Sequence, residues 1–297
     1  MATALPAPDV RLIGCGEAAM AFAGAPAGPA WAATAFDRKT DDPAAWAAKR
    51  CDYDRLGIAG ADTLAQALAG GGLILCLVTA GQALAAARAA AAQIAPGALY
   101  LDGNSVAPDT KRAAAALIDA AGGRYVDLAI MAPVLPARRS VPLLLSGAGA
   151  AAAAAALAGL GFANLRVLAG PVGMASSVKM IRSVMIKGLE ALTAECAIAA
   201  TRAGVLDDVL ATLGPASAAE FAYRLERMTT HGQRRAEEMA EVAATLSALG
   251  VPPAMASGAQ GWQSRLGGLG LAAALDPAAR LAAISAALAP PGRKDAA

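Results

Sequence analysis

Three small residues with a defined spacing lie near the start of the sequence: Gly14, Gly16 and Ala19 form GxGxxA in "RLIGCGEAAMAFA". The motif lies between an apolar run and a helix-like stretch. There the first glycine allows a tight turn, the second lets backbone approach a pyrophosphate, and the small third residue lets helix and strand pack closely. Asp37 ends the next apolar run, where an acid that binds a ribose hydroxyl belongs. The pattern predicts dinucleotide binding.

The residues around Asp37 bear on the choice between NAD and NADP. The carboxylate can accept a hydrogen bond from a ribose 2′-OH and repels a 2′-phosphate, which favours NAD. Arg38 and Lys39 follow directly and can clamp that phosphate, so NADP stays open. We expect Val78 and Thr79, after the run "LILCL", to contribute to the same cofactor site.

Polar residues also follow a later apolar run, in "YLDGNSVAPDTKR" (100–112). Asn104 and Ser105 are expected at the carboxyl edge of a strand, where ligands lie in open α/β sheets, and we expect both to contribute to the cofactor site. Alone, the pair also fits an ordinary Asn-Ser turn.

The segment "GPVGMASSVKMIRSVMIKG" (170–188) reads as an apolar helix interrupted by charges. At roughly 100° per residue its apolar residues fill a broad arc, and the polar residues Lys179, Ser183, Lys187 and Glu190 fall on a strip of about 80°. Taken alone, this helix is amphipathic with a solvated polar strip. Chemistry at the strip therefore needs support from the rest of the chain.

These residues are positioned by an alternation of apolar runs and helical stretches. Glycines, prolines and polar residues separate eight runs, namely "VRLIG", "WAATAFD", "LGIAG", "GLILCLVTAG", "ALYLDGN", "RYVDLAI", "VPLLLSG" and "NLRVL". Such a pattern predicts a mostly parallel, doubly wound Rossmann sheet. After Gly170 only helical patterns follow, with stops at Gly204, 213–215 and 250–253. We expect a Rossmann domain over 1–168 and an all-α domain over 169–297, linked by a helix over 174–200.

Composition excludes several other classes. The chain has 297 residues, 57% of them hydrophobic, and a net charge of +2. Much of the apolar content is alanine, a poor residue for a membrane span, so we expect no membrane segment. Weak net charge and 4% aromatic residues argue against nucleic acid. Four scattered cysteines and one histidine favour reduced thiols in a cytoplasm, with no metal site.

With these motifs in place, the chain resembles the β-hydroxyacid dehydrogenase family, which includes 6-phosphogluconate and 3-hydroxyisobutyrate dehydrogenases. Residues 102–112 blend its D-x-S-T-x-x-P and G-N-S-x-x-x-D-T-x-R substrate motifs. The catalytic motif G-x-x-G-x-G-x-x-x-K-x-x-x-N is matched by Gly170, Gly173, Ala175, Lys179 and Ser183. "HGQRRAEEMAEV" marks a less characterised branch with a phosphogluconate-dehydrogenase-like C-terminal domain.

The resemblance implies a cleft between the two domains, with the polar strip facing it. Lys179 resembles the general acid/base, a role that requires its pKa to fall from about 10.4 through desolvation and nearby cations such as Arg182 and Lys187. Asn104 and Ser183 are the other expected catalytic residues, and Ser105 and Lys187 are expected to bind substrate. The family also implies a homodimer.

The sequence departs from the family pattern at several places. Ser183 replaces the motif asparagine, and "PVLPA" (133–137) replaces the substrate loop "PVSGG", which leaves open whether Arg138 and Arg139 touch substrate. A strongly patterned helix is expected over 231–250. His231 at its start is read either as a partly exposed or capping residue or, with Arg234, as a contact for an anionic substrate. Arg235 and Glu238 read as a simple surface pair.

The sequence therefore predicts hydride transfer between NAD or NADP and a small, anionic β-hydroxy acid or related carbonyl. An imine reductase shares this architecture, although those enzymes generally lack the family lysine. A dinucleotide sensor without turnover is the alternative from another class. Substrate identity, reaction direction and pathway are not contained in the sequence.

Overall fold

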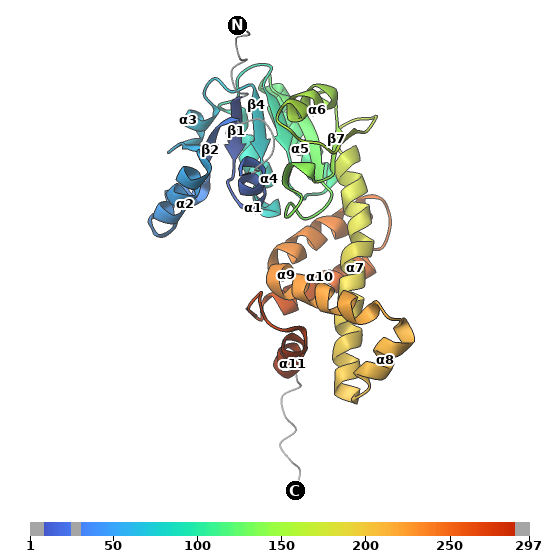
Figure 1. Cartoon of the computed structure of the whole chain (residues 1–297). Helices are drawn as coiled ribbons and strands as arrows, with labels where there is room; N and C mark the ends of the chain where they lie inside the picture. Colours follow the sequence, from blue (N-terminus) through green and yellow to red (C-terminus); the bar gives the residue numbers. More distant parts are fainter. Residues whose placement is uncertain (1–8, 25–30, 289–297) are drawn as a thin grey trace. The chain divides into compact units, whose positions relative to one another are not determined.

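The computed structural model describes residues 9–24 and 31–288. The chain forms two compact units, Met1–Met180 and Ile181–Ala297, and the division falls inside helix α7 (Met174–Ala203). The first unit contains the sheet, and the second consists of helices (Figure 1). The expected α/β class with a helical C-terminal half is confirmed. The expected domain boundary after residue 168 lies just before α7, at the end of the last strand.

Each of the eight apolar runs forms a strand. They are β1 (Asp9–Ile13), β2 (Ala32–Phe36), β3 (Ala59–Gly60), β4 (Leu73–Cys76), β5 (Leu99–Asp102), β6 (Arg124–Ile130), β7 (Leu143–Ser146) and β8 (Leu165–Val167). The sheet order is β3-β2-β1-β4-β5-β6-β7-β8, antiparallel only between β6 and β7. Its first six strands have the Rossmann order, with the carboxyl edge at the switch between β1 and β4.

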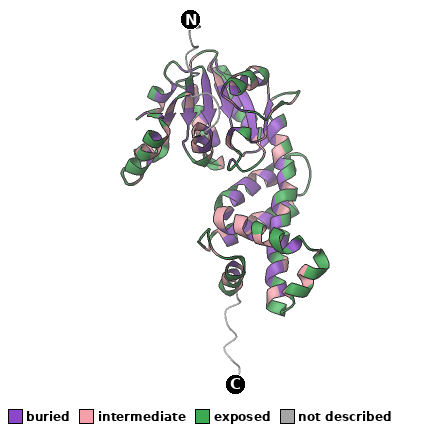
Figure 2. Cartoon of the chain, viewed as in Figure 1, coloured by how far each residue is buried: buried purple, intermediate pink, exposed green. Residues whose placement is uncertain are grey.

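Helices cover both faces of the sheet, which explains why the strands read as continuous apolar runs. The helices and 3₁₀ turns of this unit are α1 (Glu17–Ala23), η1 (Arg38–Asp41), α2 (Pro43–Leu56), α3 (Leu64–Leu68), η2 (Ala80–Gln82), α4 (Ala83–Ala91), α5 (Pro108–Ala120), η3 (Arg138–Ser140) and α6 (Ala150–Gly159). One core joins α1, α2 and α6 to the sheet, and the other joins α3, α4 and α5. The strands are largely buried (Figure 2).

The second unit is built from the later part of α7 with α8 (Leu206–Leu213), α9 (Ser217–Ala248), α10 (Ala254–Gly267) and α11 (Pro277–Ala287). Its core draws on α7, α9, α10 and α11, for example Ile198, Met228, Leu266 and Ile284. The predicted stops at Gly204, 213–215 and 250–253 coincide with the breaks between α7, α8, α9 and α10.

Helix α9 is longer than its sequence pattern indicates. The patterned stretch was expected over 231–250, yet the helix begins at Ser217. His231 therefore lies in the middle of a helix and is not a capping residue, although it is partly exposed as expected. Gly232 permits a close crossing with α10, since a Cβ there would lie 2.3 Å from the carbonyl oxygen of Gln263.

Helix α7 turns its polar strip inward. Ser183 and Lys187 are buried, at 7% and 5% exposure, whereas Ile181 and Met185 on the apolar arc are 49% and 64% exposed. The alternative of a solvated polar strip is therefore wrong for Ser183 and Lys187. Within the described residues, every helix is too short or too polar to cross a lipid bilayer.

Candidate functional site

The glycine turn after β1 has the geometry that the motif requires. Gly14 has φ of +82°, and a Cβ there would lie 2.6 Å from the carbonyl oxygen of Leu77, so only glycine fits. Gly16 is the N-cap of α1, and a Cβ added to it would meet nothing within 4 Å. Ala19 is fully buried where α1 packs on the sheet. Backbone at the start of α1 is thus open to a phosphate group, and the turn fits a dinucleotide.

Asp37 is held in place at the end of β2. Its Oδ2 accepts a hydrogen bond from the Cys15 N–H at 2.8 Å, and its Oδ1 accepts one from Lys39 N–H at 2.9 Å. Each carboxylate oxygen has a further lone pair for a ribose hydroxyl. The neighbouring Arg38 donates from Nη1 to Gln82 Oε1 at 2.6 Å, which joins the loops after β2 and β4.

A lysine that sequence reasoning missed supports the same turn. Lys49 of α2 is 6% exposed, and its ammonium donates to the carbonyl of Cys15 at 2.7 Å and pairs with Asp52 at 2.9 Å. Burial raises the pKa of the Cys15 thiol to about 11, so this thiol stays protonated at neutral pH.

Asn104 links the edges of β4 and β5. Its Oδ1 accepts a hydrogen bond from Val78 N–H at 2.6 Å, its Nδ2 donates to Cys76 Sγ at 3.4 Å, and its backbone N–H donates to Asp102 Oδ1 at 2.9 Å. Burial raises the pKa of the Cys76 thiol to about 12, so it is a neutral partner. Two contacts therefore fix the side-chain amide of Asn104, and a third fixes its backbone.

Ser105 follows Asn104 in the sequence, and Thr79 follows Val78, whose N–H binds the Asn104 side chain. The hydroxyl oxygen of Ser105 is buried and has no hydrogen-bond partner among the residues that the structure describes. Thr79 is exposed and precedes η2. A buried hydroxyl without a partner costs free energy until a ligand bonds to it, which fits the cofactor-binding role predicted for Ser105.

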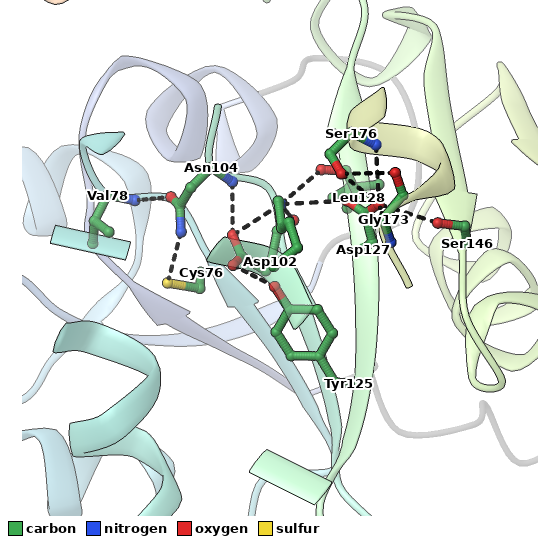
Figure 3. Close-up of polar contacts among 11 residues, drawn as sticks. Cys76, Val78, Asp102, Asn104, Tyr125, Asp127, Leu128, Ser146, Gly173 and Ser176 are labelled. Atoms are coloured by element: carbon green, nitrogen blue, oxygen red, sulfur yellow. Dashed lines mark hydrogen bonds and ion pairs between the residues drawn. The ribbon is translucent and has the colours of Figure 1, made fainter. Parts of the chain in front are cut away.

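A row of polar side chains crosses three neighbouring strands at the level where β5 ends. Asp102 of β5 is in register with Asp127 of β6, which is in register with Ser146 of β7 (Figure 3). Lys111 of α5 lies among them, 3.2 Å from Asp102 Oδ1 and 3.5 Å from Asp127 Oδ1. Sequence reasoning missed Asp127 and Lys111, although a charge inside an otherwise apolar strand run was the signal for Asp127.

The row also holds the first turn of α7, the helix of the expected catalytic lysine. Asp127 Oδ2 accepts hydrogen bonds from the N–H groups of Gly173 and Ser176, and Ser146 Oγ accepts one from Ala175 N–H. Lys179 lies one turn further along α7 and is half-buried.

The other residues of the strip form a second polar network. Lys187 donates to Ser183 Oγ at 3.3 Å and pairs with Glu238 of α9 at 2.8 Å. Arg234, one turn before Glu238, binds the same carboxylate. Because Ser183 accepts from the ammonium, its own O–H is left to donate. Ser183, Lys187 and Arg234 are thus joined through contacts within the helical unit.

The expected surface pair of Arg235 and Glu238 is wrong. Arg235 is 8% exposed and forms a two-point ion pair with Glu190 of α7, with Nε 3.2 Å from Oε2. Gln263 of α10 donates to the same Oε2 at 2.6 Å. The motif "HGQRRAEEM" therefore ties α9 to α7 and α10.

Arg138 and Arg139 bind backbone carbonyls at the ends of α1 and α6. Arg138 donates to Gly24 O at 2.7 Å, and the buried Arg139 donates to Phe22 O at 2.8 Å and Leu160 O at 3.0 Å. These contacts give both arginines a structural role. Among residues 9–24 and 31–288, no cluster of His, Cys, Asp or Glu suits a metal ion.

The fold, the glycine turn and the fixed Asp37 define a dinucleotide-binding Rossmann protein with a helical second unit. The family described as "NAD binding domain of 6-phosphogluconate dehydrogenase" matches residues 9–160, and a family described as a domain of unknown function, DUF1932, matches residues 200–266. The chain belongs to the first of these families. It is therefore an NAD(P)-dependent oxidoreductase by family, and it has the fold of 3-hydroxyacid dehydrogenases.

Individual relatives agree with this assignment. A conserved hypothetical protein from Sinorhizobium meliloti 1021 is 34% identical, with a TM-score of 0.70 over 95% of this chain and 97% of that chain. The 3-hydroxyisobutyrate dehydrogenase YgbJ from Salmonella typhimurium shares the fold at 20% identity, with a TM-score of 0.67 over 87% and 94% of the two chains. An uncharacterized 28.5 kDa protein from Methanothermus fervidus is 30% identical over 148 residues, which are 48% of this chain and 56% of that protein. The match thus spans little more than half of this curated relative.

Proposed function

We propose that the protein transfers a hydride between a nicotinamide cofactor and a small β-hydroxy acid or its carbonyl counterpart, with Lys179 as general acid/base. One observation carries the proposal. The helix that bears Lys179 is fixed by its first turn to the polar row of the sheet, and the same row fixes Asn104 at the cofactor edge.

The nicotinamide supplies or accepts the hydride, and the protein's residues handle the proton. In the oxidative direction the Lys179 amine takes the hydroxyl proton, and in reduction the ammonium returns it to the carbonyl oxygen. Asn104, whose amide is held by Val78 and Cys76, orients the reacting group. Ser183 donates its O–H to substrate, because its oxygen already accepts from Lys187.

NAD is the proposed cofactor, with NADP as the alternative outcome. Asp37 is oriented by two backbone N–H groups and presents negative charge where a 2′-phosphate would lie. Arg38 is engaged with Gln82 in the structure, and a 2′-phosphate would have to compete with that contact.

A small anion is the proposed substrate, contacted by Ser105, Lys187, His231 and Arg234. Lys187 and Arg234 share the single carboxylate of Glu238, so these three side chains together carry one net positive charge. That charge attracts a carboxylate or phosphate.

A substrate panel tests the proposal. Purified protein is assayed with β-hydroxy acids under NAD and NADP, and with the matching aldehydes and cyclic imines under NADH and NADPH. Turnover of a β-hydroxy acid or aldehyde supports it. Preferential imine reduction indicates an imine reductase, and tight cofactor binding without any turnover indicates a sensor.

A further inference from the structure

Three buried charges lie together beneath the Asn104 edge and are not explained by cofactor binding. Lys111, Asp102 and Asp127 are each fully buried. The Lys111 ammonium donates to the carbonyl of Asp102 at 2.5 Å and to that of Leu128 at 3.5 Å, and it faces both carboxylates. It thus bridges β5 and β6 from helix α5.

The Asp127 side of this cluster acts as the cap of α7. Gly173 accepts the first intrahelical bond, from Ser177 N–H, so it occupies the N-cap position but has no side chain to bond the following N–H groups. Asp127 replaces that side chain from a distant strand, with 3.1 Å to Gly173 N and 2.9 Å to Ser176 N. Its negative charge is also favourable at a helix N-terminus.

A side chain at position 173 would be strained. Gly173 has φ of +105°, and a Cβ there would lie 2.5 Å from Arg112 Nη1. The first turn of α7 is therefore capped from the sheet, by Asp127 together with Ser146.

The Asp102 side of the cluster holds the Asn104 turn. Asp102 Oδ1 accepts from Asn104 N–H, and Oδ2 accepts from the Tyr125 hydroxyl at 2.6 Å. Burial raises the pKa of Tyr125 well above its usual value, so this phenol remains a neutral donor. One continuous chain of contacts then runs from Val78 through Asn104, Asp102, Lys111 and Asp127 to α7. Figure 3 labels Val78, Asn104, Asp102 and Asp127 along it.

A buried ion cluster of this kind adds little stability over an apolar core, and its better attested use is to specify one arrangement. We infer that Lys111 is a positioning residue that locks the first turn of α7 to the Asn104 edge, and so sets the place of Lys179. The role assigned to Lys179 here rests on the proposed function. The mechanical link between Asn104 and α7 does not.

Hydrogen exchange followed by mass spectrometry tests the link, with and without saturating NADH or NADPH. In the parent protein, cofactor binding at the Asn104 edge is expected to slow amide exchange over 173–177. In Lys111→Met this exchange should be on the order of tenfold faster without cofactor, and the cofactor-induced slowing should vanish. Exchange over α4 should change less than about threefold, because α4 lies outside the chain of contacts.

Two further variants show whether faster exchange over 173–177 comes from loss of the Lys111 bridge or from a buried charge left without its partner. Tyr125→Phe is the matched control: it removes a donor to Asp102 but leaves the Lys111 bridge, and exchange over 173–177 should stay within about threefold of the parent. Lys111→Met/Asp127→Asn removes one charge of each sign. If Lys111 acts as a bridge, amide exchange over 173–177 stays fast in this double variant, whereas recovery of the parent's exchange would overturn the inference.

If Lys111→Met does not fold, Asp127→Asn alone provides the test, because it keeps the side-chain volume. It should speed exchange over 173–177, and exchange like that of the parent would overturn the link.

The chemical readout uses Lys179 itself. The pH dependence of its acylation by an amine-directed reagent, read by peptide mass spectrometry, should shift in Lys111→Met and not in Tyr125→Phe. An unchanged profile together with unchanged exchange refutes the positioning role. A shifted profile in a protein whose Lys179→Ala variant retains full turnover keeps the link and rejects the proposed function.

Discussion

Lys179 lies half-buried on the second turn of α7, one turn beyond the cap that Asp127 provides. If it exchanges the proton, Lys179→Ala should lower kcat by on the order of 10²–10⁴, the usual worth of general acid/base catalysis. Lys179→Arg should fail as well, because a guanidinium stays protonated and cannot act as base. Steady-state kinetics on the best substrate of the panel measures both.

Dinucleotide affinity provides the internal check on this prediction. It should barely change in Lys179→Ala, since the glycine turn that receives the phosphates is formed by other residues. Arg166→Ala on the exposed part of β8 is the matched loss of a cation and should leave kcat unaltered. If kcat of Lys179→Ala stays within about threefold of the parent's, Lys179 does not transfer the proton.

Gly16 and Asp37 carry the prediction for cofactor binding. Gly16→Val places a branched side chain in the open space over the start of α1, so fluorescence titration should show loss of both NADH and NADPH binding. Asp37→Ala should weaken NADH and relatively favour NADPH, because a carboxylate that repels a 2′-phosphate is removed. A parent protein that binds NADPH tightly and NADH hardly at all contradicts the role given to Asp37.

Strand β4 carries a pH effect through its last residue. Burial raises the pKa of Cys76 from 9.0 to about 12, so the folded protein keeps a proton that the unfolded chain releases above pH 9. Its contribution to stability is therefore present below pH 9 and is lost as pH rises toward 12. Between pH 8.5 and 10.5 this thiol should cost about 2 kcal/mol of unfolding free energy.

Urea unfolding of the parent and Cys76→Ala at these two pH values measures that loss. The variant is less stable at both, but its decline with pH should be smaller by the amount assigned to the thiol. Cys51→Ala, which removes an exposed thiol, should decline like the parent. Equal declines in all three proteins would show that Cys76 ionises normally.

At the scale of strands and helices, the sequence predicts most of the fold for a physical reason. Strands buried on both faces are uninterrupted apolar runs, so all eight were located, and breaks at glycine and proline marked the helix ends. The glycine turn and Asp37 were found because their chemistry depends on short spacings. The predicted start of helix α9, residue 231, lies after its real start at Ser217, because residues 217–230 lack the strong pattern of the stretch that follows.

Two features of the site were beyond sequence reasoning for a physical reason. The two backbone N–H groups that Asp127 caps are 46 and 49 residues away, so spacing along the chain gives no sign of its role as a cap. The periodicity of α7 separates polar from apolar residues but does not say which set is buried. The polar strip became the inner one because Arg235 and Glu238 of α9 supply its ion partners.

At the scale of the whole molecule, one face of α7 is both apolar and exposed. Large apolar side chains recur along it with spacings of three and four residues, namely Ile181, Met185, Leu189 and Leu192, and each is at least 39% exposed. Such spacing is typical of a helix that packs against another helix. We propose that a second copy of the chain covers this face in a homodimer, since one helix face packed on its own symmetry mate is self-complementary.

Light scattering after size exclusion tests this at micromolar concentration. The parent should elute as a dimer, and Met185→Glu/Leu192→Glu as a monomer, because each carboxylate would be buried without a partner in the interface. Leu249→Glu, at an equally exposed leucine beyond the end of α9, should remain dimeric. A monomeric parent, or a double variant that stays dimeric, would mean that a second copy does not cover this face of α7.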